Sequence, residues 1–580
     1  MIGIVLFIVL AVYLQATSRF HFFYVEQLQL FQFSGDYLSE RLCRPGGLAL
    51  LTGEFLTQFY ATPYVGAVVT AGLLTTAGLL MRSLLRQLNP SRELPLLYLL
   101  PSLGLLLAQY DFNYLTQGTV AYLLALASLR GWAGLGERRR LGVALLIVPL
   151  LFAAAGSVAM LFAFCTLLFE LLCTPRRVFP AILIPAEAVL LAVGSVWGLA
   201  VTDYRFAFLP DGYYHPILRA PVSVYLAWIA LPFGLVGARY WWRSPVASRK
   251  RAIGEGIVQL ALFGAIAGWS VPRYDDHNAY PLKELDYYAR TEQWERIVRR
   301  CEGPLNNYLY LNYLNRALAE RGELADRMFT FDQRGTMGLL IPWNKTFSVS
   351  TLLSDIYFTL GEVALAQEMA FEGYTTVIGA GNPRNLQRLI QTNLIFGAYP
   401  VAEKYISILE RTYAYRDWAK RHRAFLYDDK AVEADPLLGM KRTGLPRESD
   451  LAGIRGLDKD LLARAEAHPG QPLPIQFVGS LYLLTKDMQA FQVLVDRYYG
   501  TPALPTLPVA FQEAVLLLNE KTPDKWKQYA ISDATKVRFA AFRKMVAQYR
   551  GDSRLPFLLR QSFGESYWSY FIFKRIQTKR

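Results

Sequence analysis

Residues 1–271 alternate between long apolar runs and short polar loops, whereas residues 272–580 form a polar chain without a further run of that length. A helix needs about 20 apolar residues to cross a hydrocarbon core of ~30 Å. The pattern therefore predicts an all-α protein with nine membrane-spanning helices followed by a helical domain. The predicted spans are 1–17, 63–81, 94–109, 116–130, 141–155, 157–173, 180–202, 220–239 and 252–271.

The charges of the loops predict the orientation of these spans. Lys and Arg are enriched in cytoplasmic loops of membrane proteins. Alternate loops hold fourteen such residues, and the remaining loops hold five over a longer stretch. We therefore expect an inner-membrane protein with its N-terminus inside and residues 272–580 in the periplasm. The first span has no basic residue before it and no small-residue cleavage site, so we expect it to remain uncleaved.

The composition excludes some classes of partner. The net charge of +14 comes partly from the basic inside loops, and in the second half basic and acidic residues are interspersed. We therefore expect no nucleic-acid partner. Four cysteines make neither a disulfide framework nor a zinc site. Cys43 and Cys301, both predicted outside, could pair, although free thiols are the simpler expectation.

Residues 272–580 repeat one pattern of paired amphipathic helices. In ERGELADRM (320–328) and LGEVALA (360–366) a helix breaks at Gly or Glu and a second helix begins with small residues. The pattern resembles degenerate tetratricopeptide-like repeats, which implies stacked helix pairs that bind a protein partner or acceptor. The stretch 427–470 breaks the period, as an insertion or a long surface loop would. The aromatic, basic C-terminus is expected to pack on the array or to lean on the membrane.

Polar residues collect in three loops on the predicted outer side. The first outer loop, 18–62, has 45 residues, which is long for a connector. Carboxylates from three loops could hold a divalent cation through oxygen ligands or deprotonate an acceptor hydroxyl. The candidates are Glu26, Asp36 and Arg44 in the first loop, Asp111 in the second, and Asp203, Arg205 and His215 in the third.

The acidic residue just beyond the first span resembles the GT-C superfamily of polyprenyl-phosphate-dependent glycosyltransferases. Glu26 in YVEQLQLF occupies the matching place, and Asp36 is the second candidate. The resemblance implies a catalytic base or metal partner at the outer membrane face and a lipid-phosphate-linked sugar donor. Many of these enzymes have two adjacent acids here, whereas Gln27 follows Glu26 in this chain. On this hypothesis Glu26 or Asp36 is catalytic, Glu26 and Asp111 bind the cation, and Arg44, Asp111, Asp203, Arg205 and His215 contact the substrate.

The full length also resembles an uncharacterised multipass membrane family of Bacteroidota, known as a domain of unknown function. The similar pieces are E-Q-x-Q-L-F, beginning at Glu26, and P-G-G-L followed by G-x-F-L-x-Q-F within residues 45–59. This resemblance implies no activity.

Each candidate residue also has a structural interpretation. Glu26 could pair with Arg19 or Arg44, Asp111 could cap a helix, and His215 could lie at an interface. Two other classes of function remain open. A membrane-anchored scaffold would gather envelope proteins on the repeat domain. A transporter would use an ionisable group within the membrane, for which Glu187 is the candidate.

Overall fold

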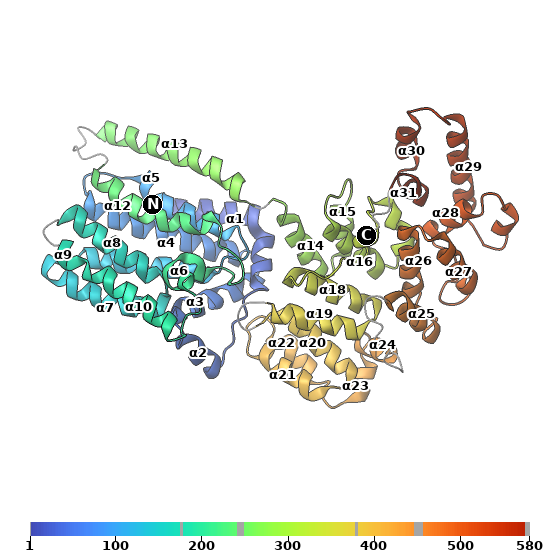
Figure 1. The fold of residues 1–580 in the computed structure, drawn as a ribbon, viewed down its shortest axis with the longest axis horizontal. Helices are drawn as coiled ribbons and strands as arrows, with labels where there is room; N and C mark the ends of the chain where they lie inside the picture. The colour runs from blue at the N-terminus through green and yellow to red at the C-terminus, as the bar shows by residue number, and fades with distance from the viewer. Residues whose placement is uncertain are drawn as a thin grey trace. The chain divides into compact units, whose positions relative to one another are not determined.

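The computed structural model describes residues 2–174, 178–240, 249–275, 277–376, 381–445 and 456–574. The fold is built from helices, and these ranges contain no strand, which confirms the all-α prediction. The chain divides into two compact units (Figure 1). Unit 1 comprises Met1–Lys283 together with Ile408–Asp417 from the later chain, and unit 2 comprises most of the chain after Lys283.

Unit 1 contains a helix at each of the nine apolar runs. Five helical segments are long and apolar enough to cross a membrane, so length and composition support five spans rather than the nine predicted. They are Gly3–Glu26, Val65–Leu88, Val178–Trp197, Val222–Tyr240 and Lys250–Tyr274. The nine helices are α1 (Ile2–Glu26), α4 (Val65–Leu88), α5 (Pro95–Gln109), α6 (Thr116–Ala133), α7 (Glu137–Ala155), α8 (Val158–Cys173), α10 (Leu183–Trp197), α12 (Val222–Tyr240) and α13 (Arg249–Tyr274).

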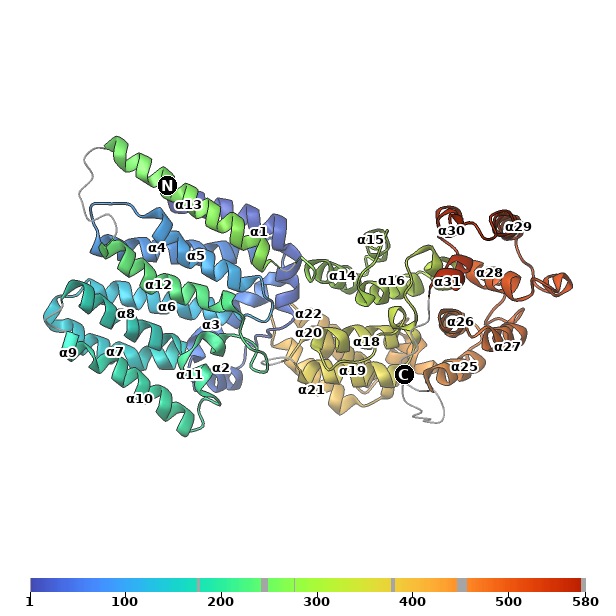
Figure 2. The same ribbon diagram turned by 45° about the horizontal axis from the view of Figure 1, so that its top comes forward.

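The burial of these helices agrees with a membrane environment. Helix α5 is almost completely buried between α4 and α12, so it meets protein rather than solvent. In contrast, α1, α10 and α13 expose large apolar side chains, including Ile8 (54%), Leu190 (73%) and Ile257 (61%). Helix α13 runs along one edge of the unit in both views (Figures 1 and 2). Apolar surface of this extent is costly in water and is expected for helices that face lipid.

The chain after α13 forms shorter helices that pack in sequence. Helix α18 packs on α19, and α19 packs on α20. The helices are α14 (Tyr280–Arg290), α15 (Trp294–Arg300), α16 (Tyr308–Glu320), α17 (Leu324–Arg327), α18 (Phe347–Leu360), α19 (Val363–Thr375), α20 (Pro383–Phe396), α21 (Tyr399–Glu410), α22 (Arg416–Arg423), α23 (Asp429–Ala434), α24 (Leu438–Thr443), α25 (Leu457–Ala467), α26 (Leu473–Thr485), α27 (Met488–Tyr498), α28 (Val509–Leu518), α29 (Asp533–Gln548), α30 (Leu555–Phe563) and α31 (Tyr567–Phe573).

Five helix pairs share one backbone turn, in which the first or second residue after the first helix has a positive φ and the next residue donates its N–H to a carbonyl five positions back. This is the bond of a Schellman motif, and it satisfies a carbonyl at the helix end. The pairs are therefore a structural repeat, although their spacing along the chain varies. The positive-φ residues are Glu292, Gly322, Gly361, Gly397 and Lys486, and the bonds join Gln293 to Tyr288, Glu323 to Leu318, Glu362 to Tyr357, Ala398 to Asn393 and Asp487 to Tyr482 at 2.8–2.9 Å.

Alanine is expected to be worse tolerated at Gly361 than at Gly322. Both glycines have a left-handed φ, which costs a residue with a Cβ about 1–2 kcal/mol. A Cβ at Gly361 would also lie 2.4 Å from Arg464 Cζ, whereas nothing described lies within 4 Å of one at Gly322. Arg464 is buried and donates to the carbonyls of Gly361 (3.1 Å) and Gly444 (2.6 Å), so it cannot move away cheaply.

We expect Gly322→Ala to lower the stability of unit 2 by about 1 kcal/mol and Gly361→Ala by about 3 kcal/mol. Hydrogen exchange of the full chain, followed over the helices on either side of each turn, measures both losses. Equal losses would show that Arg464 does not constrain the turn.

A buried ion network joins α16, α18 and α20. The Asp355 carboxylate contacts Arg316 (3.0 Å), Arg388 (2.9 Å) and Arg384, and Arg384 also pairs with Asp286 at 2.5 Å. Burial alone would raise the pKa of Asp355, but the three guanidinium groups outweigh it and hold that pKa well below its usual range. The network therefore keeps one carboxylate ionised between three successive helix pairs.

Two further predictions concern the end of the chain. Within 427–470 the described residues form the short helices α23, α24 and α25 rather than a plain loop, and residues 446–455 lie outside the described ranges. The aromatic segment forms α31, where Trp568 is fully buried and donates its Nε1–H to the carbonyl of Glu513 at 2.8 Å. Residues 567–573 therefore pack on the helical array, one of the two alternatives for this segment, and the basic residues 575–580 lie outside the described ranges.

Candidate functional site

Three loops of unit 1 meet at the end of the bundle where α1 finishes. The first loop reaches the α7–α8 turn, because the Gly46 N–H donates to the Ala153 carbonyl at 2.9 Å. The Leu115 N–H donates to the Tyr213 carbonyl at 2.9 Å, which joins the second loop to the third. We call this region, formed by residues 26–64, 110–116 and 203–216, the loop end. The Thr57 hydroxyl donates to Thr116 Oγ1 at 3.2 Å, so the first loop also contacts the second, and the three loops come together.

Glu26 is the last residue of α1 and is buried, with 3% of its surface exposed. Its carboxylate accepts hydrogen bonds from the Tyr415 hydroxyl (2.8 and 3.0 Å) and from Gln27 Nε2 (2.5 Å). Tyr415 comes from the Ile408–Asp417 segment that belongs to unit 1. Burial of a carboxylate is costly unless donors replace water, so these bonds explain how Glu26 remains inside.

The first loop contains two short helices, α2 (Gly35–Leu42) and α3 (Gly47–Thr57), and α3 carries a second buried carboxylate, Glu54. Tyr37 donates a hydrogen bond to Glu54, and Arg41 Nη2 lies 3.8 Å from its Oε1. Burial raises the pKa of Glu54, and the charge of Arg41 opposes that rise only in part. Arg41 is itself 93% buried, since its exposed fraction is 7%, and its Nε has no hydrogen-bond partner among the described residues.

Asp36, predicted in the same loop, lies on the exposed side of α2, and Arg44 lies two residues beyond the end of that helix and is also exposed. Arg44 pairs with the exposed Glu40 at 2.6 Å. Positions 36, 40 and 44 follow each other at helical spacing, and positions 37 and 41 form the neighbouring, buried row. The helix therefore separates the predicted candidates from Tyr37 and Arg41.

Asp111 is bound within the second and third loops. Its Oδ1 accepts from the backbone N–H (2.9 Å) and the amide (3.0 Å) of Asn113, and its Oδ2 accepts from the Tyr214 hydroxyl at 2.6 Å. These bonds give Asp111 a structural part in joining the loops. Nearby Asp211, which is buried, accepts from Tyr225 in the same way.

The remaining candidates of the third loop interact locally. Asp203 caps the short helix α11 (Tyr204–Phe208) by accepting from the Arg205 N–H at 2.8 Å, and its other oxygen lies 3.4 Å from the Arg205 guanidinium. Both side chains are more than 40% exposed. His215 is half-buried, burial lowers its pKa, and its Nδ1 accepts from the Ile217 N–H at 3.4 Å.

The sequence matches a family model over residues 1–574, which cover unit 1 and all but the last six residues of unit 2. The chain belongs to the family of unknown function DUF6057. The predicted full-length resemblance to a family of unknown function is thereby confirmed. No curated protein and no solved structure matches the chain.

The loop end of this DUF6057 protein does not fit the expected divalent cation. Within the described ranges no three His, Cys, Asp or Glu side chains lie close enough together to hold a metal ion. The two expected ligands, Glu26 and Asp111, are hydrogen-bonded to Tyr415 and Tyr214 respectively. The chemistry of this region therefore rests on its own side chains, without a cation at Glu26 and Asp111.

Proposed function

We propose that all nine apolar helices of unit 1 lie in the inner membrane, with the N-terminus inside and the loop end outside. The excess of Arg and Lys in alternate loops supports this orientation. Helix α5 has 15 residues and a length of about 22 Å. A helix of that length can lie within the bilayer because neighbouring helices surround it. On this proposal unit 2 is periplasmic, and its helix pairs are tetratricopeptide-like repeats.

Cys43 is a natural reporter of this orientation. It is exposed in the first loop, whereas Cys165 and Cys301 are buried and Cys173 is half-buried. We expect a membrane-impermeant maleimide to label this protein in intact spheroplasts. Cys43→Ser should remove most of the label from the protein. Labelling that requires permeabilisation of the membrane would place the loop end inside.

We propose further that the protein is a GT-C-like glycosyltransferase that uses a lipid-phosphate-linked sugar at the outer face. The observation that carries this proposal is a group of buried polar atoms in the first loop that have no hydrogen-bond partner among the described residues. They are Gln29 Nε2, Arg41 Nε and Gln58 Oε1. Buried polar groups are almost always hydrogen-bonded, so these atoms favour a polar ligand beside the buried carboxylates Glu26 and Glu54.

The proposed reaction assigns a part to each buried group. The acceptor hydroxyl gives its proton to Glu26 while its oxygen attacks the anomeric carbon of the donor sugar. The bond from that carbon to the lipid phosphate oxygen breaks, and the phosphate leaves with the negative charge. Arg41 neutralises the phosphate, and Glu54 with Tyr37 orients Arg41. Arg41 replaces Arg44 and Arg205 in this part because those two are exposed and already paired.

Two arginines of the first loop, Arg41 and Arg44, test this assignment. Purified full chain in lipid nanodiscs is given radiolabelled polyprenyl-phosphate sugars and a cell-envelope extract as the source of acceptor, and label that leaves the lipid is counted. We expect Arg41→Gln to reduce transfer about 10- to 100-fold, because a charge-assisted contact to phosphate is lost. Arg44→Gln should retain transfer within about twofold, since its exposed ion pair contributes little. If Arg41→Gln and Arg44→Gln lost transfer equally, Arg41 would not be the phosphate-binding residue. The absence of transfer from every donor would contradict the enzyme proposal.

A membrane-anchored scaffold is the second candidate function, and the five repeated helix turns of unit 2 favour it. Stacked helix pairs present extended surfaces that bind proteins. A scaffold predicts that Glu26→Gln and Arg41→Gln leave envelope assembly unchanged, whereas a transferase predicts that both impair it. A transporter finds support only in Glu187 of α10, whose Oε2 has no partner among the described residues.

A further inference from the structure

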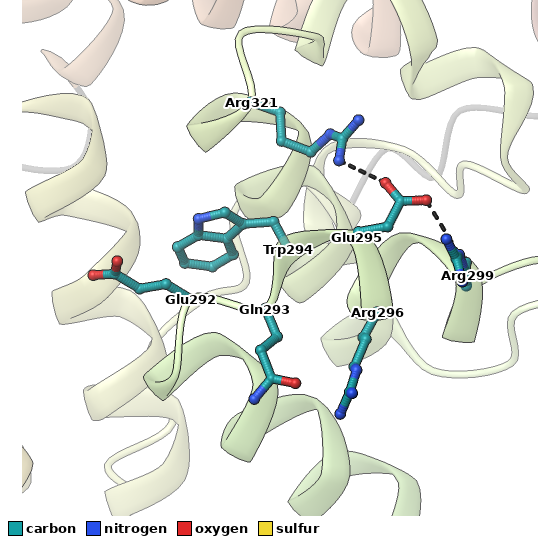
Figure 3. A pocket seen from close by; sticks show the side chains of 7 residues that line it. All are labelled: Glu292, Gln293, Trp294, Glu295, Arg296, Arg299 and Arg321. Atoms are coloured by element: carbon teal, nitrogen blue, oxygen red, sulfur yellow. Dashed lines mark hydrogen bonds and ion pairs between the residues drawn. The ribbon is translucent and has the colours of Figure 1, made fainter.

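A hollow of about 560 Å³ lies where the first two helix pairs of unit 2 meet (Figure 3). One wall is the turn between α14 and α15 together with α15 itself, and the other is the end of α16 at Arg321. Its volume lies within the range of about 300–1,000 Å³ found for small-molecule sites. The lining residues are Glu292, Gln293, Trp294, Glu295, Arg296, Arg299 and Arg321.

Most of the charged side chains on one side of the hollow are paired with each other. Glu295 accepts from Arg321 at 2.6 Å and from Arg299 at 3.2 Å, as the dashed lines of Figure 3 mark. Arg321 also donates to Glu323 at 2.8 Å. Two of the three lining arginines, Arg299 and Arg321, are thus bound to carboxylates. A site for phosphate needs guanidinium groups that are free to bind it, so this pairing favours a ligand that is polar but uncharged.

The hollow also contains a fixed aromatic surface. Trp294 is half-buried, and Arg316 lies over its ring with Cζ 5.1 Å from the centroid. Arg316 is held in turn by the ion pair with Asp355 at 3.0 Å. Because Arg316 is buried and paired, the indole has little freedom to rotate away, and it offers a preorganised flat surface.

This set of groups matches the chemistry of a sugar. The apolar C–H face of a pyranose packs on an indole ring, which buries area without a demand for charge. Adjacent hydroxyls need neighbouring donors and acceptors, and planar amide, carboxylate and guanidinium groups present these in pairs. Gln293, Glu292 and Arg296 supply one of each type in the lining that also contains Trp294.

We propose that this hollow is a binding site for a neutral oligosaccharide. The site uses only residues of unit 2 and none of the loop end, so it does not depend on the proposed transfer reaction. On this proposal unit 2 itself binds a glycan.

Saturation-transfer NMR of the full chain in lipid nanodiscs tests the proposal. Nanodiscs avoid detergents with sugar headgroups, which would compete for the site. The probes are neutral trisaccharides of glucose, mannose, galactose and N-acetylglucosamine at millimolar concentration, with inorganic phosphate as the charged alternative. We expect at least one trisaccharide to bind, and we expect Trp294→Ala to weaken it by at least about tenfold.

Trp343→Ala is the matched control, because Trp343 is also half-buried and hydrogen-bonds Ser350 outside the hollow. It should leave binding unchanged, and Trp294→Phe should retain binding within about fivefold because a ring remains. Gln293→Ala tests the same site without removing the aromatic surface and should weaken binding several-fold. The proposal is overturned if no trisaccharide binds, if Trp294→Ala and Gln293→Ala bind as well as wild type, or if only phosphate binds.

Discussion

Glu26→Gln is expected to abolish sugar transfer while the protein still folds. General-base catalysis contributes about 10²- to 10⁴-fold to a rate, and the amide cannot take a proton from the acceptor. Glutamine has nearly the same size and can still accept the hydrogen bond from the Tyr415 hydroxyl that holds the residue now. The transfer assay in nanodiscs measures the loss, and the yield and thermal midpoint of the purified chain report on folding.

Two further variants make this result specific to Glu26. Asp36→Asn removes the second candidate acid, which lies exposed on α2, and should leave transfer within about twofold. Tyr415→Phe removes a donor to Glu26 and should lower transfer less than Glu26→Gln does. Full transfer by Glu26→Gln, or a larger loss in Asp36→Asn, would refute the assignment of the base.

Asp355→Asn is expected to cause the largest loss of stability in unit 2. The substitution leaves three buried arginines without their shared carboxylate, and breaking a buried ion pair costs about 3–5 kcal/mol. Asp524→Asn is the control, because Asp524 is 91% exposed and its pair with Lys527 should contribute less than about 1 kcal/mol. Substituting Arg388 in the Asp355→Asn variant should restore part of the lost stability, because one uncompensated charge is removed.

The same network predicts that acid lowers the stability of unit 2. The pKa of Asp355 is lowered in the folded protein, so its stabilisation is fully present above the unfolded value of about 4. That stabilisation is lost as the pH falls from there through the folded value. Hydrogen exchange of α18 and α20 measures both the destabilisation by Asp355→Asn and the destabilisation at low pH. If Asp355→Asn lost no more stability than Asp524→Asn, the arginines would have found other partners.

The apolar runs located the nine helices of unit 1, because burial in lipid or protein requires the same apolar residues. They did not locate the end of the first helix. The predicted span stops at 17, whereas α1 continues to Glu26. Phe20, Phe22 and Val25 are buried, so the polar extension is held by tertiary packing that hydropathy does not register.

The candidate site shows the same limit. Glu26 was identified from the sequence, but its partner Tyr415 lies 389 residues away and leaves no local signal. Arg41 could have been distinguished from Arg44 had residues 35–42 been assigned as a helix, because positions 37 and 41 then share one face. In unit 2 the breaks predicted within 320–328 and 360–366 coincide with the turns at Gly322 and Gly361, where a positive φ favours glycine.

Photo-crosslinking of a polyprenyl phosphate to the full chain in nanodiscs tests the central claim most directly. The probe carries a photoreactive group next to its phosphate, and mass spectrometry locates the modified peptides. We predict crosslinks within residues 26–58, at the buried groups of the first loop, and their loss in Arg41→Gln but not in Arg44→Gln. Crosslinks confined to other parts of the chain, or none at all, would contradict a lipid-phosphate site at the loop end.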